Sequence, residues 1–594
     1  MKTRLIRLRF RRRFRKSQQQ VGDLSTQAEQ GIDRHFFKRF ERLLPIRRFL
    51  LGWIGLVVLL IAGLIAQNLT LSTHYQTLRS VPGGIYKEGV RGRFTNANPM
   101  YATTDADTTV SRLIFAGLFT YDKEGKLVGD LAQEYAVDEH GTTYTVRLKP
   151  NLTWQDGQKL TSKDVVFTYQ AIQNPDAQSP LQSSWQKISV TATDESTVVF
   201  KLPSALASFP YTMTNGIVPE HILSKVPATD MRSADFNTVH PIGAGPFAWR
   251  AIQVTGNGDP KTAEEQIALK PFKAYQGGAP KLQEFVVRVF ADADQLIKAY
   301  NDNQLTAIEG YTAVPRELRN NHSIVQNNLP LRAANMVFFK TTAGVLANQP
   351  VRRALVQGTN TNSIIKNLGY TTRAVREPFL AGQLGYDPSL AQASFDLNAA
   401  KAALEADGWQ LDKSGFRSKA GQPLAFTLTV PNAVEGRSVG AQLQKQWKQL
   451  GVKVNTQVLG ASEFQNALTY HSYDAVLNGI SIGIDPDVFV YWDSTQADIR
   501  SANRLNLSEY KNTSADAALE SGRTRIDPTL RIIKYKPFLQ EWQKDAPALG
   551  LYQPRLLYIT RGSVDGLDDR PLTTSSDRFS NVQNWQIRQA RVTN

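Results

Sequence analysis

The sequence predicts an α/β protein with one transmembrane helix near the N-terminus, and three observations support this fold class. The 594 residues are 41% hydrophobic and 21% charged, a composition typical of a folded protein with about two to four domains. An uncharged apolar run occupies residues 49–66. Beyond residue 84, runs with the two-residue period of strands alternate with runs that have the period of helices, which favours an α/β architecture.

Positive charge is concentrated in the first 48 residues. They hold 15 Lys and Arg but 4 Asp and Glu, a net charge of +11, whereas the remaining 546 residues carry only +5. We interpret residues 1–48 as a basic cytoplasmic tail. Such a tail fits anionic lipid better than a nucleic acid because a membrane anchor follows it, and a topology signal alone explains it equally well. We therefore expect no nucleic-acid partner.

The apolar run FLLGWIGLVVLLIAGLIA is long enough to cross a bilayer, because 18 helical residues span about 27 Å. A buried core helix is the alternative, but the run is uncharged on every face and Arg47 and Arg48 flank one side only. The long basic region before it and the lack of a small-x-small site argue against a cleaved signal peptide. We predict an uncleaved signal-anchor at 49–67, single-pass in the cell membrane, with a tether at 68–83 and an extracytoplasmic remainder.

Elements of both types continue along the extracytoplasmic chain. In its first half we expect strands at 85–90, 285–290 and 305–309, two strand-like runs within 190–202, and helices at 108–119 and 292–301. In its second half we expect strands at 335–339, 424–430, 452–454 and 473–477, and helices at 351–356, 398–407 and 440–450.

The stretch from Gly141 to Gln170 has the clearest local pattern. Residues 143–148 alternate polar and apolar side chains, as in a half-buried strand. Thr161 and Asp164 stand three residues apart, as in a capping box with Asp in place of Glu, and a short apolar helix follows. We interpret this stretch as a scaffold and not as a site.

The sequence gives little support for catalytic or metal chemistry. None of the seven histidines lies within five residues of another, and the chain has no cysteine, so a zinc site is not indicated. There is no Gly-x-Ser-x-Gly motif, although a dispersed Ser-His-Asp triad stays open. Turn and capping roles explain Asp485-Pro486-Asp487 more simply than acid–base catalysis does. We expect no metal, no cofactor and no enzymatic activity.

A series of short motifs follows in order along the chain: Asn98-Pro99, Ile114–Leu118, Gly129–Ala132, Thr143–Leu148, Trp154–Gly157, Thr161–Tyr169, Gly243–Phe247, Gly277–Pro280, Val351–Leu355, Leu450–Val452 and Asp545–Pro547. Together they resemble the motifs of the large extracellular solute-binding proteins of ABC transporters (family 5, cluster C), a class that binds oligopeptides, dipeptides, nickel complexes and some sugars. Each motif is short, but their order and spacing make the resemblance specific over roughly residues 84–570.

The resemblance implies a two-lobe periplasmic-binding-protein type II fold with an extra subdomain in the first lobe. Ligand binds between the lobes of such a fold, and closure buries it. Carried over to this chain, the fold places lobe 1 at 84–128, 236–333 and 546–594, the extra subdomain at 129–235, and lobe 2 at 334–545.

The implied function is that of a receptor that captures a solute, in the first place a peptide, and delivers it to the permease subunits of an ABC importer. We expect a monomer. Three alternatives stay open: a sensor or peptide chaperone without transport, a binder of a non-peptide ligand such as an oligosaccharide, and a hydrolase. A hydrolase would need a nucleophile hydrogen-bonded to a histidine in a cleft.

The resemblance also suggests where a ligand binds. In lobe 1 we expect contacts near Asn96 and Asn98. In lobe 2 we expect them at Gly479, Ile480, Ser481, Ile482, Asp485, Tyr491 and Trp492. Arg373 or Arg376 is a candidate for a ligand carboxylate, although exposed loop charges more often bind nothing specific.

The sequence departs from the family at the position expected to hold a peptide amine. Peptide-binding members often carry an acid shortly before the Asp-Pro-Asp loop, and aligned on Asp485-Pro486-Asp487 this position falls on Ile482. Burial of an ammonium group against Ile482 would cost several kcal/mol. Either Asp485 serves instead or the ligand is not a free-amine peptide. The chain also lacks the family's usual Asp-Arg charges near Asn360-Thr361, and it has an anchor helix where a lipidated cysteine or free export is usual.

Overall fold

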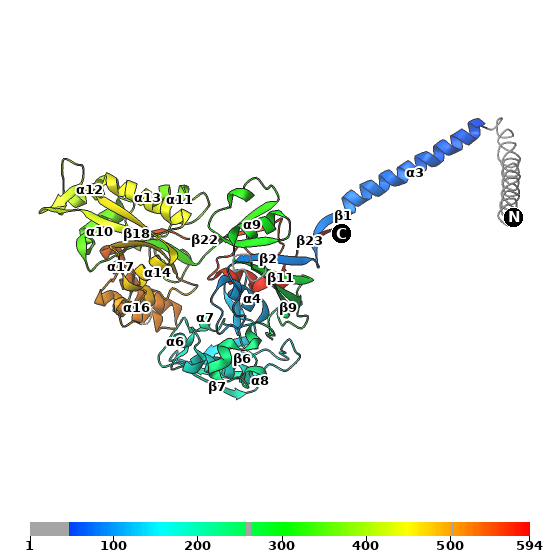
Figure 1. The fold of residues 1–594 in the computed structure, drawn as a ribbon, viewed down its shortest axis with the longest axis horizontal. Helices are drawn as coiled ribbons and strands as arrows, with labels where there is room; N and C mark the ends of the chain where they lie inside the picture. Colours follow the sequence, from blue (N-terminus) through cyan, green and yellow to red (C-terminus); the bar gives the residue numbers. More distant parts are fainter. Residues whose placement is uncertain (1–46, 257–262, 502–503, 594) are drawn as a thin grey trace, which may run out of the picture. The chain divides into compact units, whose positions relative to one another are not determined.

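The computed structural model describes residues 47–256, 263–501 and 504–593 (Figure 1). Apart from Arg47 and Arg48, the predicted basic tail therefore lies outside the described residues. Contacts divide the chain into two compact units, residues 1–79 with 589–594 and residues 80–588, which are described separately.

The first unit contains a long helix and a strand pair. Helix α3 (Arg47–Tyr75) includes a 21-residue span, Arg48–Asn68, with a mean hydropathy of 2.7 and no burial inside the protein. The tether predicted at 68–83 is instead helical up to Tyr75, because no Pro or Gly interrupts residues 69–75. Strand β1 (Gln76–Val81) follows and pairs with β23 (Arg588–Thr593), so the last residues assigned to lobe 1 belong to this strand pair.

Lobe 1 is built on a seven-stranded mixed sheet in the order β13-β22-β12-β2-β11-β10-β9. Its strands are β2 (Ile85–Arg91), β9 (Phe247–Thr255), β10 (Glu264–Pro271), β11 (Glu284–Phe290), β12 (Ala307–Tyr311), β13 (Ile324–Pro330) and β22 (Arg555–Arg561). Strand β2 runs parallel to β11 and β12 and the other pairs are antiparallel. Helices α4 (Asp105–Ile114) and α9 (Ala293–Asn301) pack on this sheet.

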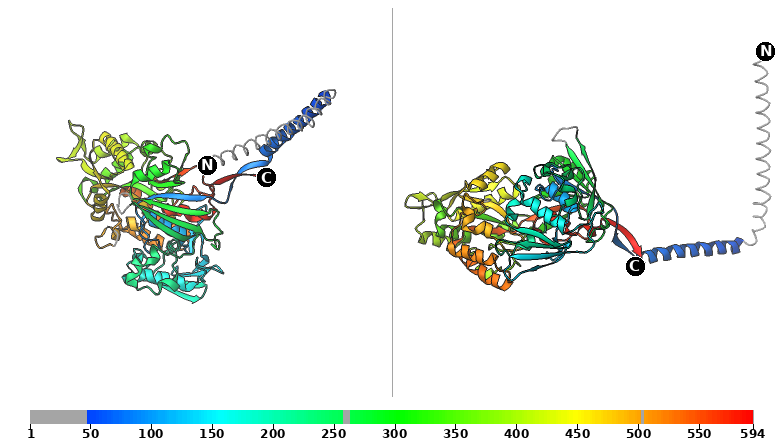
Figure 2. Two further views of the ribbon diagram at one scale, coloured as in Figure 1. Left: turned by 45° about the vertical axis from the view of Figure 1, so that its right-hand side comes forward. Right: turned by 90° about the horizontal axis from the view of Figure 1, so that it is seen from below.

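The extra subdomain carries a four-stranded antiparallel sheet in the order β5-β6-β8-β7, on the opposite side of α4 from β2 in the view of Figure 1, with further views in Figure 2. Its strands are β5 (Ala132–Val137), β6 (Thr143–Leu148), β7 (Ser189–Asp194) and β8 (Thr197–Lys201), and helix α5 (Ser162–Gln173) packs on β7 and β8. The predicted capping box of Thr161 and Asp164 is confirmed, with both hydrogen bonds present. Tyr144, Val146 and Leu148 are buried on one face of β6, as the alternation predicts.

Lobe 2 has a five-stranded sheet in the order β19-β18-β20-β14-β21. Its strands are β14 (Ala333–Phe339), β18 (Ala425–Pro431), β19 (Lys453–Leu459), β20 (Ala475–Ser481) and β21 (Ala548–Tyr552). The helices of this lobe include α10 (Gln349–Gln357), α12 (Leu397–Ala406), α13 (Val434–Gln449), α14 (Ala461–Tyr470), α16 (Thr513–Arg523) and α17 (Pro528–Asp545).

Two further predicted boundaries are wrong. Strand β21 was assigned to lobe 1 within 546–594, but it pairs with β14 and all five of its residues are buried, so lobe 2 extends to Tyr552. The helix predicted at 108–119 ends at Ile114, and residues Phe119–Tyr121 form strand β3. Phe115 already has an extended backbone, and Gly117 then passes so close to another segment that a Cβ atom there would lie 2.5 Å from the carbonyl oxygen of Thr214.

A buried ion triad joins three segments of lobe 1. Arg578 donates from Nη2 to Glu88 Oε1 at 2.9 Å, and its Nη1 lies 2.7 Å from Glu309 Oε2. Tyr558 donates a further hydrogen bond to Glu88. One guanidinium group thus faces two carboxylates, and burial is the main cause that raises the pKa of Glu309 to about 7.

This triad predicts a pH dependence of stability. The folded-state pKa of Glu309, about 7, is above the reference value of 4.5, so the folded state binds the proton more tightly. The contribution of Glu309 to the free energy of unfolding is therefore complete below pH 4.5, and it is lost as the pH rises through about 7. We expect Glu309→Gln to make the free energy of unfolding less pH-dependent in this window, on the order of 1–3 kcal/mol.

Urea unfolding of the full-length protein in detergent from pH 4.5 to 7.5 would measure this, with the exposed Glu317→Gln as the matched control. A wild-type protein and Glu309→Gln with parallel stability profiles would contradict the prediction.

Candidate functional site

The second unit contains a cavity of about 520 Å³ between the extra subdomain, the start of lobe 1 and a loop of lobe 2. Its lining residues come from five regions of the chain, and most are small, hydroxyl-bearing or aromatic. They include Pro99, Ala102, Thr108, Ser111, Arg112, Phe115, Tyr121, Leu181, Ser184, Trp185, Ser208, Tyr211, Thr212, Thr214, Asn215, Gly216, Ile482, Gly483, Ile484, Asp485, Asp487, Thr573, Thr574, Ser576 and Asp577. No histidine is among the described residues that line it.

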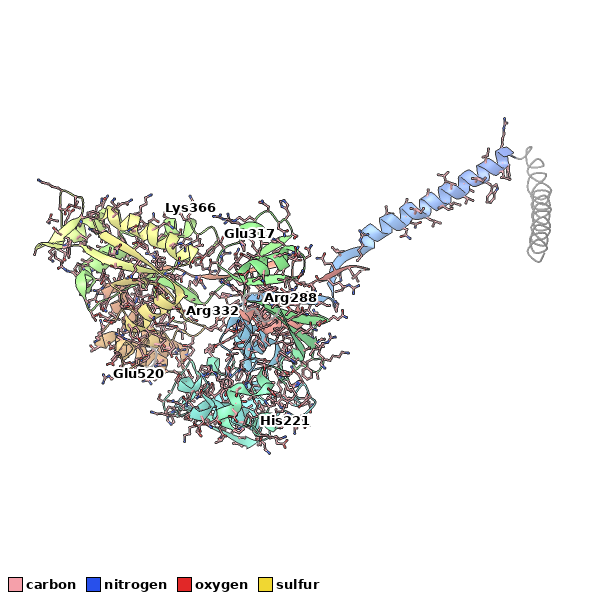
Figure 3. The ribbon with its side chains drawn as sticks, in the orientation of Figure 1. His221, Arg288, Glu317, Arg332, Lys366 and Glu520 are labelled. Atoms are coloured by element: carbon pink, nitrogen blue, oxygen red, sulfur yellow. The ribbon has the colours of Figure 1, made fainter. Side chains whose placement is uncertain are left out.

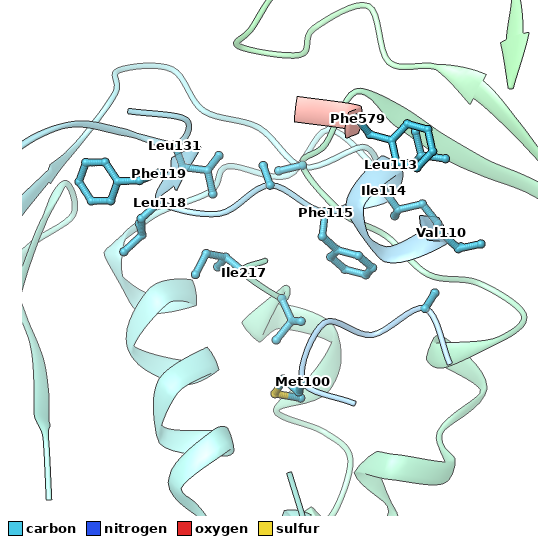
Figure 4. Packing of buried hydrophobic residues seen from close by; sticks show 14 of the residues in the cluster. Met100, Val110, Leu113, Ile114, Phe115, Leu118, Phe119, Leu131, Ile217 and Phe579 are labelled. Atoms are coloured by element: carbon cyan, nitrogen blue, oxygen red, sulfur yellow. The ribbon is translucent and has the colours of Figure 1, made fainter. Parts of the chain in front are cut away.

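Helix α4 provides one wall because its two faces differ. Val110, Leu113 and Ile114 pack into the core of lobe 1 (Figure 4). Thr108, Ser111 and Arg112 lie on another face, spaced as i, i+3 and i+4, and reach the cavity. The Thr104 side chain caps the helix by accepting from the Asp107 backbone N–H at 3.1 Å. The apolar packing of α4 thus sets the direction of its polar face.

The extra subdomain provides a second wall from two four-residue helices, α6 (Gln182–Trp185) and α7 (Phe209–Thr212). Trp185 stacks on Tyr169 with ring centroids 3.9 Å apart, which fixes the position of α6. Tyr211 and the Ser208 side chain face the cavity from α7 and the residue before it.

The loop after β20 forms the wall contributed by lobe 2. The backbone N–H groups of Ile482 and Gly483 donate to the Arg332 carbonyl oxygen at 2.9 and 3.0 Å. The Gln383 side-chain amide donates to the carbonyl oxygens of Gly483 and Ile484. Gly483 has a φ of +77°, a conformation that favours glycine. These bonds hold the loop rigidly against the cavity.

Two ion pairs stiffen the same wall. Asp485 accepts from both terminal nitrogens of Arg531, at 2.6 and 2.7 Å, and both side chains are buried. Asp487 lies 3.1 Å from Arg523 Nη2, and the same oxygen accepts from the Ser208 hydroxyl at 3.1 Å. Both carboxylates in the loop are therefore already neutralised by arginines of lobe 2.

The structure brings two of the nine predicted ligand residues to the cavity. Ile482 and Asp485 line it. Asp485 is fully engaged by Arg531, so the expectation that it shifts to hold an amine has a geometric obstacle. Ligand contact by either residue stays a prediction.

The other predicted residues lie away from the lining. Asn96 and Asn98 are buried. The Asn96 side chain donates to Arg232 O and accepts from the Asn98 backbone N–H, and the Asn98 side chain donates to Asn237 Oδ1. Trp492 is fully buried against Phe338 and Trp542. Gly479, Ile480 and Ser481 belong to β20, and the hydroxyl of Tyr491 donates to Ser481 O.

The arginines proposed for a ligand carboxylate are also elsewhere. Arg376 lines a separate cavity of about 140 Å³ and donates to Gln392 O and Ser394 Oγ. Arg373 lies in neither this cavity nor the one between the lobes among the described residues. In the described part of the chain there is also no cluster of three or more His, Cys, Asp or Glu that would hold a metal ion.

Sequence reasoning missed Arg112, Tyr211 and Asp577, which come from three separate regions. A signal for Arg112 was present, since the polar residues of α4 repeat with helical spacing opposite an apolar face. Tyr211 gave no comparable signal because a four-residue helix places it, whereas Asp577 stands three residues after Thr574 and forms a capping box with it at the start of the 3-10 helix Ser575–Asn584.

The Asp485–Arg531 pair leads to a stability prediction. Asp485→Ala should leave a buried guanidinium without its carboxylate and lower the free energy of unfolding by about 3–5 kcal/mol. The double variant Asp485→Leu/Arg531→Met should recover most of this loss, because it removes both charges. Urea unfolding measures both effects. A normal stability of Asp485→Ala would show that the pair is not a structural requirement.

The fold and the cavity can be compared with those of known proteins. Over 523 residues the chain is 25% identical to the oligopeptide-binding protein AppA of Bacillus subtilis, covering 85% of this chain and 92% of AppA. It is 27% identical to protein XP55 of Streptomyces lividans over 465 residues, covering 76% of this chain and 81% of XP55.

Solved structures have the same fold. AppA of Bacillus subtilis in complex with a nonapeptide matches with a TM-score of 0.66 and 23% identity, covering 86% of this chain and 100% of that one. NikZ of Campylobacter jejuni in complex with Ni(L-His) matches with a TM-score of 0.70 and 22% identity, covering 85% and 99%. These likenesses confirm the predicted two-lobe periplasmic-binding-protein fold.

The family model of the middle region of bacterial extracellular solute-binding proteins, family 5, matches residues 126–501. This match spans the extra subdomain, the crossover at Arg332 and most of lobe 2, and the lining residues within 99–121 and 573–577 lie outside it. The chain therefore belongs to the family 5 extracellular solute-binding proteins, as its motifs predict.

Proposed function

We propose that this protein is a membrane-held receptor that captures a peptide or another small solute in the cavity between its lobes and delivers it to the permease subunits of an ABC importer. The observation that carries the proposal is that both lobes contribute residues to the wall of one cavity. Residues of α4, the extra subdomain and the 482–487 loop face one space of about 520 Å³. This volume is within the range of about 300–1,000 Å³ that is usual for small-molecule sites.

Contacts between the walls support a closing mechanism. The Ala207 backbone N–H donates to Arg523 O at 2.9 Å, and Ser208 Oγ donates to Asp487 Oδ2 at 3.1 Å. Both bonds join the extra subdomain to lobe 2, so they form and break as the lobes close and open. A ligand that contacts both walls adds contacts that exist only in the closed state, and it therefore shifts the equilibrium toward closure.

The ligand class follows from the wall chemistry and the relatives. Hydroxyl groups, aromatic rings and backbone groups dominate the lining, and such surfaces accept varied side chains while polar groups orient the ligand. The relatives AppA and NikZ are described with a nonapeptide and with Ni(L-His). We propose a peptide or a solute of similar size for this chain, with the binding unit acting as a monomer.

Helix α3 supports the membrane part of the proposal. Its Arg48–Asn68 span has the length and hydropathy to cross a bilayer, and the two arginines at its start match a cytoplasmic end. A tethered receptor remains close to its permease, so capture and delivery occur on one membrane surface.

Ligand binding can be tested with a variant that fills the cavity. We expect full-length protein in detergent to gain thermal stability with members of a peptide and oligosaccharide library. Ser184→Trp, at the cavity wall, should weaken binding of each hit at least about tenfold, or about 1.4 kcal/mol. Ser438→Trp on the exposed face of α13 is the control. If no library member stabilises the wild-type protein, the proposed function is wrong.

The anchor can be tested by fractionation. We expect the full-length chain to remain in the membrane fraction after a carbonate wash and a chain that lacks residues 1–75 to be released, because α3 supplies the apolar span. Intact-mass analysis of the membrane-bound protein should show an uncleaved N-terminus. A mature chain that begins after residue 68 would instead identify a signal sequence.

A further inference from the structure

The short crossover between β21 and β22 is bridged by a direct contact between the two lobes. Only Gln553 and Pro554 separate β21 of lobe 2 from β22 of lobe 1. Arg332, in the other crossover, marks this region between the lobes in Figure 3. The Cζ atom of Arg555, the first residue of β22, lies 3.9 Å from the ring centroid of Tyr370 in lobe 2. A guanidinium group at this distance is attracted by the negative face of the ring.

Lobe 2 holds the Tyr370 ring in place. The Tyr370 hydroxyl donates to Glu435 Oε2 at 3.2 Å, and Glu435 Oε1 accepts from the Tyr552 hydroxyl at 2.6 Å. The segment that follows Tyr370 is tied to the crossover, because the Gln553 backbone N–H donates to Arg373 O at 2.9 Å. The ring therefore moves together with lobe 2.

Arg555 belongs as firmly to lobe 1. Its backbone pairs with Pro330 of β13, and its Nη2 donates to the carbonyl oxygen of Thr312 at 3.4 Å. Its Nε is buried and has no hydrogen-bond partner in the described structure. Burial of an unpaired N–H group costs free energy, and stacking on an aromatic ring offsets part of this cost. The guanidinium group thus reaches lobe 2 through the Tyr370 ring.

This contact lies on the opposite face of the lobe 2 sheet from the cavity. On one face of β14, Phe338 packs in the apolar cluster that contains Ile482, a residue of the cavity wall. On the other face, Val337 packs in the cluster that contains side chains of α13. Glu435, which accepts from the Tyr370 hydroxyl, is at the start of α13. We call the face that α13 covers the back of the hinge.

The contact on the back of the hinge is present while the cavity walls also touch. The bonds from Ala207 to Arg523 and from Ser208 to Asp487 join the extra subdomain to lobe 2 in the same structure. Rotation at the crossover that separates these walls also changes the geometry on the back of the hinge. The attraction between a guanidinium group and a ring falls with distance and with tilt, so the stacking stabilises the closed arrangement relative to the open one.

We propose that Arg555 and Tyr370 form a brace on the back of the hinge that keeps the closed arrangement of the lobes populated in the absence of ligand. Neither of these two described residues lines the cavity. The brace therefore changes the affinity for every ligand by the same factor, through the population of the closed arrangement. This inference rests on the closing motion in the proposed function, and its main test requires no ligand.

Spin labels can measure the populations of open and closed lobes. The chain has no cysteine, so Gln170→Cys on α5 and Ala517→Cys on α16 place one label on the extra subdomain and one on lobe 2, both at exposed positions. Double electron–electron resonance on full-length protein in detergent then gives the distances between the labels. We expect a short and a long distance without ligand, and we expect Arg555→Met to raise the open-to-closed ratio at least about threefold.

Further variants separate the brace from a general loss of structure. Tyr370→Phe keeps the ring and should keep the ratio of the labelled parent. Tyr370→Leu should match Arg555→Met, and the combination of both should add nothing further, because either change alone removes the contact. Arg561→Met is the matched control, since Arg561 stacks 4.7 Å over the ring of Tyr300 within lobe 1, and it should leave the ratio unchanged.

Each outcome decides the question. An unchanged ratio in Arg555→Met and Tyr370→Leu would overturn the brace, even if their unfolding temperature falls, and so would a labelled parent that shows only the long distance. For ligands found by thermal stability, both variants should weaken binding by one common factor, whereas factors that differ between ligands would indicate direct contact and contradict the brace. If no library member binds, the proposed function fails, and the distances alone decide the brace.

Discussion

The hydrogen bonds between the two crossover segments are the constraint on which the site depends. The Leu331 N–H donates to Pro554 O at 2.9 Å, and the Gln553 side-chain amide donates to Leu331 O at 2.7 Å. These segments connect β13 to β14 and β21 to β22, so they carry every covalent link between the lobes within residues 80–588. Because Arg332 O accepts from Ile482 and Gly483, the same joint also positions the lobe 2 loop against lobe 1. Motion at this hinge therefore moves the loop and the opposite wall in a coupled manner.

Sequence alone predicted the elements that local patterns determine. The alternation in 143–148 gave β6, and Thr161 with Asp164 gave the start of α5, because both signals lie within one turn or one strand. Prediction from the sequence failed where contacts between distant segments determine the structure. Strand β21 joins β14 across more than two hundred residues, and the segment after α4 packs at Gly117 against the backbone of Thr214.

The site shows the same division. Two of the residues expected from the alignment on the Asp-Pro-Asp loop, Ile482 and Asp485, line the cavity, and their contact with a ligand stays a prediction. The partner of Asp485 lies 46 residues away on α17, and no local pattern pairs the two. Asn96 and Asn98 are close in sequence to residues that line the cavity. Their side-chain oxygens instead accept hydrogen bonds from the backbone N–H groups of Asn98 and Met100, which require acceptors because they are buried. A polar residue next to a family motif can contact a ligand or can hydrogen-bond within the protein, and the sequence does not distinguish the two.

The lobe 2 wall does not offer the free carboxylate that a receptor for a peptide amine would be expected to have. A receptor that grips an α-amine needs an unpaired carboxylate at the lobe 2 loop, but Ile482 occupies the position of the acid and Asp485 and Asp487 each face an arginine. An ammonium group buried there would pay several kcal/mol of desolvation without a counter-charge. Across the cavity, Arg112 lines the wall that α4 provides. The loop that carries Ile482 therefore holds both of its carboxylates in ion pairs within lobe 2, so a ligand at this wall would meet backbone groups and the Ile482 side chain and not a free carboxylate.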